Sequence, residues 1–139
     1  MERINRIKLY LDDIRTPVDD SWVVVRSYDE FLYHVKLHNL GSYEVISLDH
    51  DLGEDIAKEK VASGMSKRQA RAEKKLSKTG YDAAKWLVTE SMTNKIPLPQ
   101  IYCHSANPVG AENIIKYINN YNKNCMLPQS CIQVNIEHT

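Results

Sequence analysis

The fold is decided by EVISLDHDLG, residues 44–53. Its first five residues are mostly apolar or β-branched, which is typical of a buried strand. Asp49, His50 and Asp51 follow directly, and Gly53 indicates a turn. The stretch therefore predicts a strand over 44–48 whose carboxyl end carries two carboxylates and an imidazole.

Similar patterns recur on both sides of this stretch. Further strands are predicted at residues 6–11, 22–25, 101–105 and 132–136. Helices are predicted after a capping box at Ser27–Glu30, over 79–88 and over 113–121. Strands that alternate with helices predict one α/β domain over 1–139, with about five parallel strands and helices on both faces of the sheet.

Residues 54–78 do not fit the alternation. They hold eight basic and four acidic residues, and we expect a charged, partly helical insertion after the third strand. This basic insertion either lies in solvent or contacts the phosphates of a nucleotide or RNA.

Composition narrows the function classes. Eighteen basic residues balance eighteen acidic ones in this chain of 139, so generic binding to DNA or to a membrane surface is not expected. No apolar run reaches the roughly 20 residues that a membrane span needs. The three cysteines form no C-x-x-C pair, which favours a reducing cytoplasm.

Polar residues end three of the predicted strands. Ligands of open parallel sheets bind at the carboxyl ends of the strands. The residues expected at this edge are Asp12 and Asp13 after the first strand, Asp49, His50 and Asp51 after the third, and His104 and Ser105 at the end of the fourth. Asp12, Asp13 and Asp49 predict a site for Mg²⁺ or Mn²⁺, because clustered carboxylates repel one another unless a cation neutralises them. The alternative is that each Asp only caps the following helix.

The remaining candidates would act on a phosphate. His104 or His50 could protonate a leaving oxygen, or each could be a structural histidine. Arg15 could bind a phosphate or form a surface ion pair. Ser105 and the loop segment with Asn107, Gly110 and Asn113 could bind phosphate oxygens, or could be a strand end and a helix cap. These groups predict phosphate chemistry without fixing each role.

Four motifs carry a family resemblance: LDDIRTP at 11–17, SLDHDLG at 47–53, TGYD at 79–82 and HSANPVGAENI at 104–114. Together they resemble the cyclic-phosphate-processing receiver-like domain of bacteria and phages, a divergent relative of response-regulator receiver domains. The resemblance implies a three-layer, flavodoxin-like fold and action on cyclic phosphates in RNA or nucleotides.

Comparison with true receivers places Asp12 and Asp13 at the Mg²⁺ site, Asp49 at the phosphorylated Asp and Ser105 at the hydroxyl position. A receiver also needs a Lys after its fifth strand and a fifth helix, and we expect neither beyond 132–136. Phosphorelay signalling is therefore disfavoured.

These observations lead to one principal hypothesis and two alternatives. The principal hypothesis is a metal-dependent phosphoesterase that acts on a cyclic nucleotide, a cyclic oligonucleotide or an RNA 2′,3′-cyclic phosphate end. In it Asp49, His50, Asp51 and His104 are the catalytic candidates. The alternatives are a non-catalytic module that binds a cyclic nucleotide or RNA end, and a residual phosphoacceptor domain.

Overall fold

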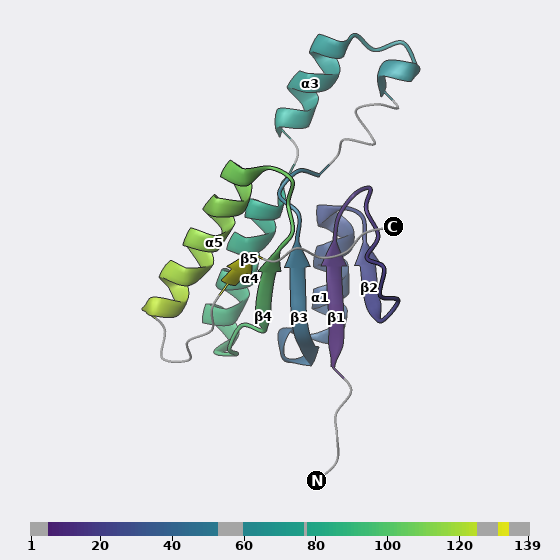
Figure 1. The fold of residues 1–139 in the computed structure, drawn as a ribbon. Helices are drawn as coiled ribbons and strands as arrows, with labels where there is room; N and C mark the ends of the chain where they lie inside the picture. Colours follow the sequence, from purple (N-terminus) through teal and green to yellow (C-terminus); the bar gives the residue numbers. More distant parts are fainter. Residues whose placement is uncertain (1–5, 53–59, 77, 125–130, 134–139) are drawn as a thin grey trace.

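The computed structural model describes residues 6–52, 60–76, 78–124 and 131–133. The elements in chain order are β1 (Ile7–Leu11), β2 (Trp22–Val25), α1 (Tyr28–His38), the 3₁₀ turn η1 (Leu40–Ser42), β3 (Tyr43–Leu48), α3 (Lys67–Leu76), α4 (Gly80–Asn94), β4 (Gln100–Cys103), α5 (Pro108–Lys123) and β5 (Cys131–Gln133). Figure 1 shows the strands side by side and α3 standing away from them. No helix in these ranges is long and apolar enough to cross a bilayer.

The strands form a parallel sheet in the order β2-β1-β3-β4, and the three-residue β5 pairs with the outer edge of β4. The predicted α/β class, parallel pairing and receiver-like topology are confirmed. The prediction of a last strand reaching residue 136 with no helix after it extends outside the described residues.

The strand ends lie level with one another. Leu11 pairs with Leu48, and Leu48 pairs with Cys103. The next residue on each strand continues the ladder: Asp49 donates its N–H to the carbonyl of Leu11, and His104 donates to the carbonyl of Leu48, both at 3.0 Å. The register therefore brings these polar side chains to one edge of the sheet, as the sequence predicted.

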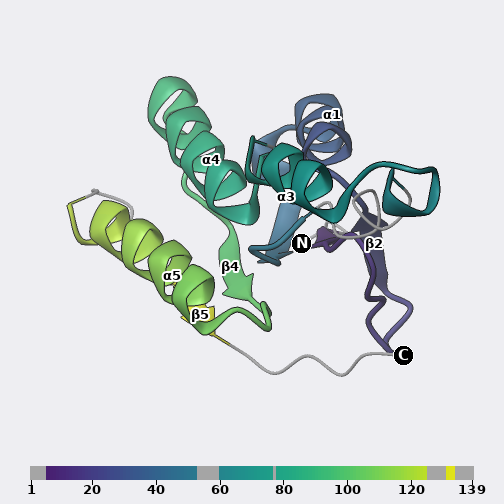
Figure 2. The same cartoon turned by 90° about the horizontal axis from the view of Figure 1, so that it is seen from above.

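The helices lie on one face of the sheet, which differs from the predicted three-layer arrangement. The connections from β2 to β3, β3 to β4 and β4 to β5 all advance in the same direction across the sheet. Right-handed crossovers then place α1, α4 and α5 on the same face. Figures 1 and 2 show no helix of the described chain on the opposite face. The only reversal, from β1 to β2, is made by a loop.

The core fills the space between this face and the helices. Leu9 and Leu11 of β1, Ile46 and Leu48 of β3 and Ile101 of β4 are all fully buried. They pack in one cluster with helix residues such as Phe31, Leu87, Ile114 and Ile118. Alternate strand residues supply the cluster, so the opposite set, which includes Tyr10 and Ser47, faces the other side.

Most helix boundaries follow local signals. Ser27 accepts from the N–H of Glu30 and begins α1, as predicted. Thr79 and Asp82 form a capping box that begins α4. The third helix begins earlier than predicted: α5 begins at Pro108 rather than at 113, because Pro is well tolerated in the first helical turn, where its missing N–H is not needed.

Candidate metal and phosphate site

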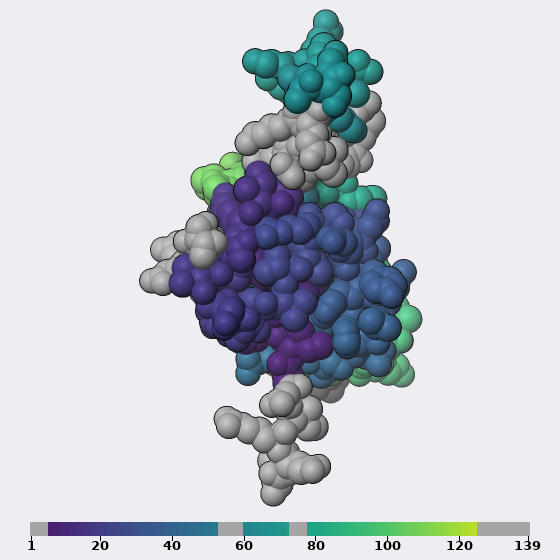
Figure 3. Space-filling view, turned by 90° about the vertical axis from the view of Figure 1, so that its right-hand side faces the viewer, coloured from purple at the N-terminus to yellow at the C-terminus, as the bar shows by residue number. Residues whose placement is uncertain are grey.

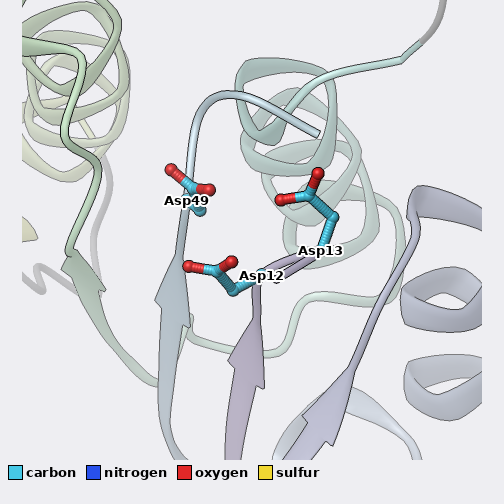
Figure 4. Close-up of side chains that lie close together, drawn as sticks. All are labelled: Asp12, Asp13 and Asp49. Atoms are coloured by element: carbon cyan, nitrogen blue, oxygen red, sulfur yellow. The ribbon is translucent and has the colours of Figure 1, made fainter. Parts of the chain in front are cut away.

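Three carboxylates meet at the carboxyl edge of the sheet. Asp12 and Asp13 follow β1, and Asp49 follows β3; one oxygen from each lies within 4.8 Å of the other two. Figure 4 shows their carboxylates gathered above the ends of β1 and β3. Asp12 and Asp49 are buried, at 1% and 4% exposure, and Asp13 is half-buried. The predicted acidic cluster therefore forms.

Asp12 is held by neighbours on both of its oxygens. Its Oδ1 accepts the backbone N–H groups of Ile14 at 2.9 Å and Arg15 at 2.8 Å. Its Oδ2 lies 3.1 Å from Nε2 of His104. Since each carboxylate oxygen has two lone pairs, Oδ1 is saturated and Oδ2 keeps one for a further partner.

The pKa values of the two buried carboxyls, Asp12 and Asp49, are shifted in opposite directions. Burial works to raise the pKa of Asp12, but hydrogen bonds from His104 and two backbone N–H groups outweigh it, and that pKa is lowered. Burial and the neighbouring charge of Asp12 raise the pKa of Asp49 to about 7, although a hydrogen bond from Ser105 and the charge of Arg15 oppose the rise. Below about pH 7 Asp49 therefore holds a proton that a cation would displace.

The donor set fits a hard divalent cation. All three groups offer carboxylate oxygen, with no sulfur or imidazole in the cluster. Mg²⁺ prefers such oxygens and is usually held by one or two carboxylates together with water and phosphate oxygens. A cation here would also relieve the repulsion that raises the pKa of Asp49. The site is thus compatible with Mg²⁺ or Mn²⁺, as the sequence predicted.

His104 lies behind Asp12 and is not among the residues that line the cavity. Its side chain is 1% exposed, and its Nδ1 lies 2.6 Å from the hydroxyl oxygen of Ser47. Its ring stacks on Tyr10 with centroids 4.1 Å apart. Both ring nitrogens therefore face protein groups, Ser47 and Asp12. His104 therefore contacts Asp12 from behind the cluster, and its expected role as leaving-group acid stays a prediction.

Two arginines organise the loop after β1. Arg26 donates to the carbonyls of Arg15 at 2.6 Å and Asp12 at 3.2 Å, and to the hydroxyl of Thr16 at 2.7 Å. The guanidinium of Arg15 donates to the carbonyl of His104 at 3.3 Å and lies 4.0 Å from Asp12. Arg26 was missed by the sequence analysis, although its place directly after β2 puts it at the same edge.

Asp51 carries a second group of contacts. Its Oδ1 lies 2.9 Å from Nδ1 of His50 and accepts from the side-chain amide of Asn107 at 3.2 Å. The ring of His50 packs on Gly110, where a Cβ would lie 2.3 Å from the imidazole Cγ. Gly110 thus admits the histidine by lacking a side chain.

Asn107, Gly110 and Asn113 lie at the start of α5 and within it. Asn107 is the N-cap of α5, and its Oδ1 accepts the N–H of Gly110 at 3.0 Å. That N–H is therefore already used, and Pro108 has none. Asn113 is exposed well inside the helix. Asn107 thus contacts Asp51 and caps the helix, and the expected role of these three residues as phosphate ligands stays a prediction.

Ser105 and Gly80 complete the surroundings of Asp49. The hydroxyl of Ser105 hydrogen-bonds to Asp49, which lowers the pKa of that carboxyl, and accepts the N–H of Asn107 at 3.0 Å. Gly80 begins α4 directly against the strand end: a Cβ there would lie 1.9 Å from the carbonyl oxygen of Asp49. The close approach of α4 explains why glycine follows Thr79.

A cavity of about 250 Å³ opens over the three carboxylates. Its lining residues are Asp12, Asp13, Ile14, Arg15, Asp49, Asp51 and Ala106. One guanidinium and four carboxyls therefore share a single polar space. An anion can enter it only where a cation and Arg15 offset the negative charge.

Comparison with known proteins gave one match. A family model described as "Cyclic-phosphate processing Receiver domain" matches residues 7–120, which is most of the chain. Neither the curated proteins nor the solved structures gave a match. The matched range contains the cavity and every residue that lines it.

Proposed function

The chain belongs to the family of cyclic-phosphate processing receiver domains, and from that membership we propose that it is a metal-dependent phosphoesterase that opens a cyclic phosphate. The observation that carries the proposal is the acidic cluster of Asp12, Asp13 and Asp49 at the floor of a cavity that Arg15 also lines. The substrate would be a nucleotide or RNA that bears a cyclic phosphate.

Asp12, Asp13 and Asp49 would hold Mg²⁺ or Mn²⁺. Such a cation, when bound, polarises a phosphoryl group and lowers the pKa of an attached water. Asp12 is fixed for this task by His104, which Ser47 in turn holds. A ligand carboxylate that is oriented by a second group keeps its position when the site is empty.

The other cavity residues would act on the substrate and the water. Arg15, which lines the cavity, would bind a phosphate oxygen. Asp51, which also lines the cavity and contacts His50 and Asn107, would accept a proton from the attacking water. The water oxygen bonds to phosphorus and one ring P–O bond breaks. The products are a phosphate monoester at that phosphorus and a free hydroxyl, whose proton comes from solvent.

A turnover screen tests this proposal. The purified protein with Mg²⁺ or Mn²⁺ is offered 2′,3′-cyclic nucleotides, 3′,5′-cyclic nucleotides, cyclic oligonucleotides and RNA that ends in a 2′,3′-cyclic phosphate, and ³¹P NMR follows ring opening. We expect one class to be opened by the wild type, and by Asp20→Asn, an exposed control in the β1–β2 loop. Opening should be lost with EDTA and in Asp49→Asn.

A folded protein that binds one of these ligands and opens none would overturn the enzyme proposal. That result would favour the alternative of a non-catalytic capture module.

A residual phosphoacceptor is the second candidate, favoured by the contact of Ser105 with Asp49 beside the acidic pair. It predicts that acetyl phosphate with Mg²⁺ adds one phosphoryl group to Asp49, as read by intact mass. Labelling that is absent in Asp49→Asn and kept in His104→Ala would support this candidate. Unlabelled wild type would exclude it.

A further inference from the structure

The segment after β3 stands out from the domain on the side that carries the cavity. α3 lies beyond the carboxyl ends of the strands in Figure 1, and the view along the strands in Figure 2 shows it above the same edge. Figure 3 shows this segment as a separate knob at one end of the molecule. We call residues 60–76 the basic arm.

Local signals build the basic arm without help from the core. A helical turn over 60–62 ends at Gly64, whose φ of 108° is typical of a helix C-terminus, with Met65 donating to the carbonyl of Lys60. Ser66 then caps α3 by accepting the N–H of Gln69 at 3.1 Å. An isolated helix of this length is marginal in water, so a binding partner would stabilise it.

The arm's charge is of one sign where its side chains are described. Residues 60–72 contain four basic residues and no acidic residue. Lys67, Arg68 and Arg71 are exposed, whereas Ala70 is buried. The first turn of α3 holds Lys67 and Arg68 and no acid, which opposes the helix dipole. These cations do not stabilise α3 itself, and their exposed side chains are available to an anionic partner.

The cavity is too small for a large ligand. Its volume of about 250 Å³ lies below the roughly 300–1,000 Å³ of sites that enclose drug-sized molecules. A cyclic phosphate and its sugar would occupy it, and the rest of the ligand would lie outside. The arm stands on that side of the molecule.

We propose that the basic arm binds the phosphate backbone of a single-stranded RNA whose cyclic-phosphate end enters the cavity. The inference rests on the proposed function for the identity of that end. It makes the substrate a polynucleotide rather than a free cyclic nucleotide. The arm supplies attraction for the strand, which offsets the repulsion that the carboxylates exert on any polyanion.

Counterion release sets the size of the effect. Each phosphate contact with a single strand contributes about 0.7 to the slope of log K against log salt, so three contacts contribute about 2. If the arm makes three such contacts, raising the salt from 50 to 200 mM should weaken their contribution to binding about 20-fold. A free cyclic mononucleotide does not reach the arm and should lack this part of the slope.

The test compares two ligands with the same cyclic end: 2′,3′-cyclic AMP and a short labelled oligoribonucleotide that ends in a 2′,3′-cyclic phosphate. Binding is measured with Ca²⁺ in place of Mg²⁺, because the cavity admits an anion only with a cation bound. The salt series is run at constant Ca²⁺ for the wild type and for the triple variant Lys67→Gln, Arg68→Gln, Arg71→Gln. We expect the variant to lose at least tenfold in affinity for the oligonucleotide at low salt, and about 2 in slope, with no change for the mononucleotide.

The control is a matched triple variant, Lys36→Gln, Lys95→Gln, Lys123→Gln. It removes three exposed charges at the C-terminal ends of α1, α4 and α5. It should bind the oligonucleotide like the wild type. The proposal that the arm binds RNA would be overturned by equal losses of affinity in the two triple variants. It would also be overturned if the oligonucleotide bound no more tightly than the mononucleotide. Turnover with Mg²⁺ is read separately and decides the proposed function alone.

Discussion

The raised pKa of Asp49 predicts that the ionised form of this carboxyl destabilises the metal-free protein. Moving this pKa from its usual 3.8 to about 7 corresponds to at most about 4 kcal/mol, at 1.36 kcal/mol per pH unit. The folded state holds the proton that the unfolded chain releases between these values. Stability therefore falls as pH rises through this window, and the full cost is present above about pH 7.

Asp49→Asn removes the ionisable group and should remove this cost. In urea unfolding with EDTA, we expect the variant to be more stable than the wild type by up to about 4 kcal/mol at about pH 8, and similar to it at about pH 4. Adding Mg²⁺ should stabilise only the wild type. Asp20→Asn, which changes an exposed carboxyl, should follow the wild type throughout. A variant that is destabilised equally at both pH values would refute the reasoning.

Three further predictions follow from the geometry. Gly80→Ala should lower the free energy of unfolding by roughly 1–3 kcal/mol and weaken Mg²⁺ binding, because its Cβ would collide with the carbonyl oxygen of Asp49. Gly41→Ala is the control, since a Cβ there would have its nearest neighbour 3.9 Å away. Equal melting temperatures of the two variants would contradict the prediction. Ser47→Ala should cost about 1–3 kcal/mol in urea unfolding, because it removes the hydroxyl that lies 2.6 Å from Nδ1 of the buried His104; an unchanged midpoint would mean that this contact does not stabilise the fold. Mg²⁺ should raise the free energy of unfolding by about 1.4 kcal/mol for each tenfold excess over its Kd, and a thermal scan that does not move with Mg²⁺ would count against the site.

The acidic cluster could be predicted because it depends on simple rules. Asp12 and Asp49 each follow an apolar run, and parallel strands bring their carboxyl ends to one edge. The arrangement of the helices on one face could also have been predicted. No helical pattern lies between residues 11 and 22, and the right-handedness of the other crossover connections then places their helices on the same face. The prediction of both faces overlooked that step.

The role of His104 could not be predicted in the same way. Its position after β4 was right, but the direction of each ring nitrogen depends on Ser47 of β3 and Asp12 of the β1 loop. Only the assembled sheet brings these three together. The buried hydroxyl of Ser47 among apolar strand residues was the available signal, since such a group needs a partner.

Asn107 illustrates a different limit. The same polar-Pro-Gly pattern indicates a loop that binds phosphate or a cap that begins a helix. Which of the two occurs depends on whether the backbone N–H groups are already used. Here the N–H of Gly110 donates to Asn107 itself, a local choice that spacing does not reveal.

The central claim is that Asp12, Asp13 and Asp49 form a divalent-cation site, and titration with Mn²⁺ tests it most directly. The free Mn²⁺ signal is followed by electron paramagnetic resonance as wild type, Asp49→Asn and Asp20→Asn are added in turn. The account predicts one saturable site in the wild type and in Asp20→Asn, with affinity that rises between about pH 6 and 8 as Asp49 loses its proton, and at least tenfold weaker binding in Asp49→Asn. Equal binding by all three proteins, or no saturable site in the wild type, would contradict it.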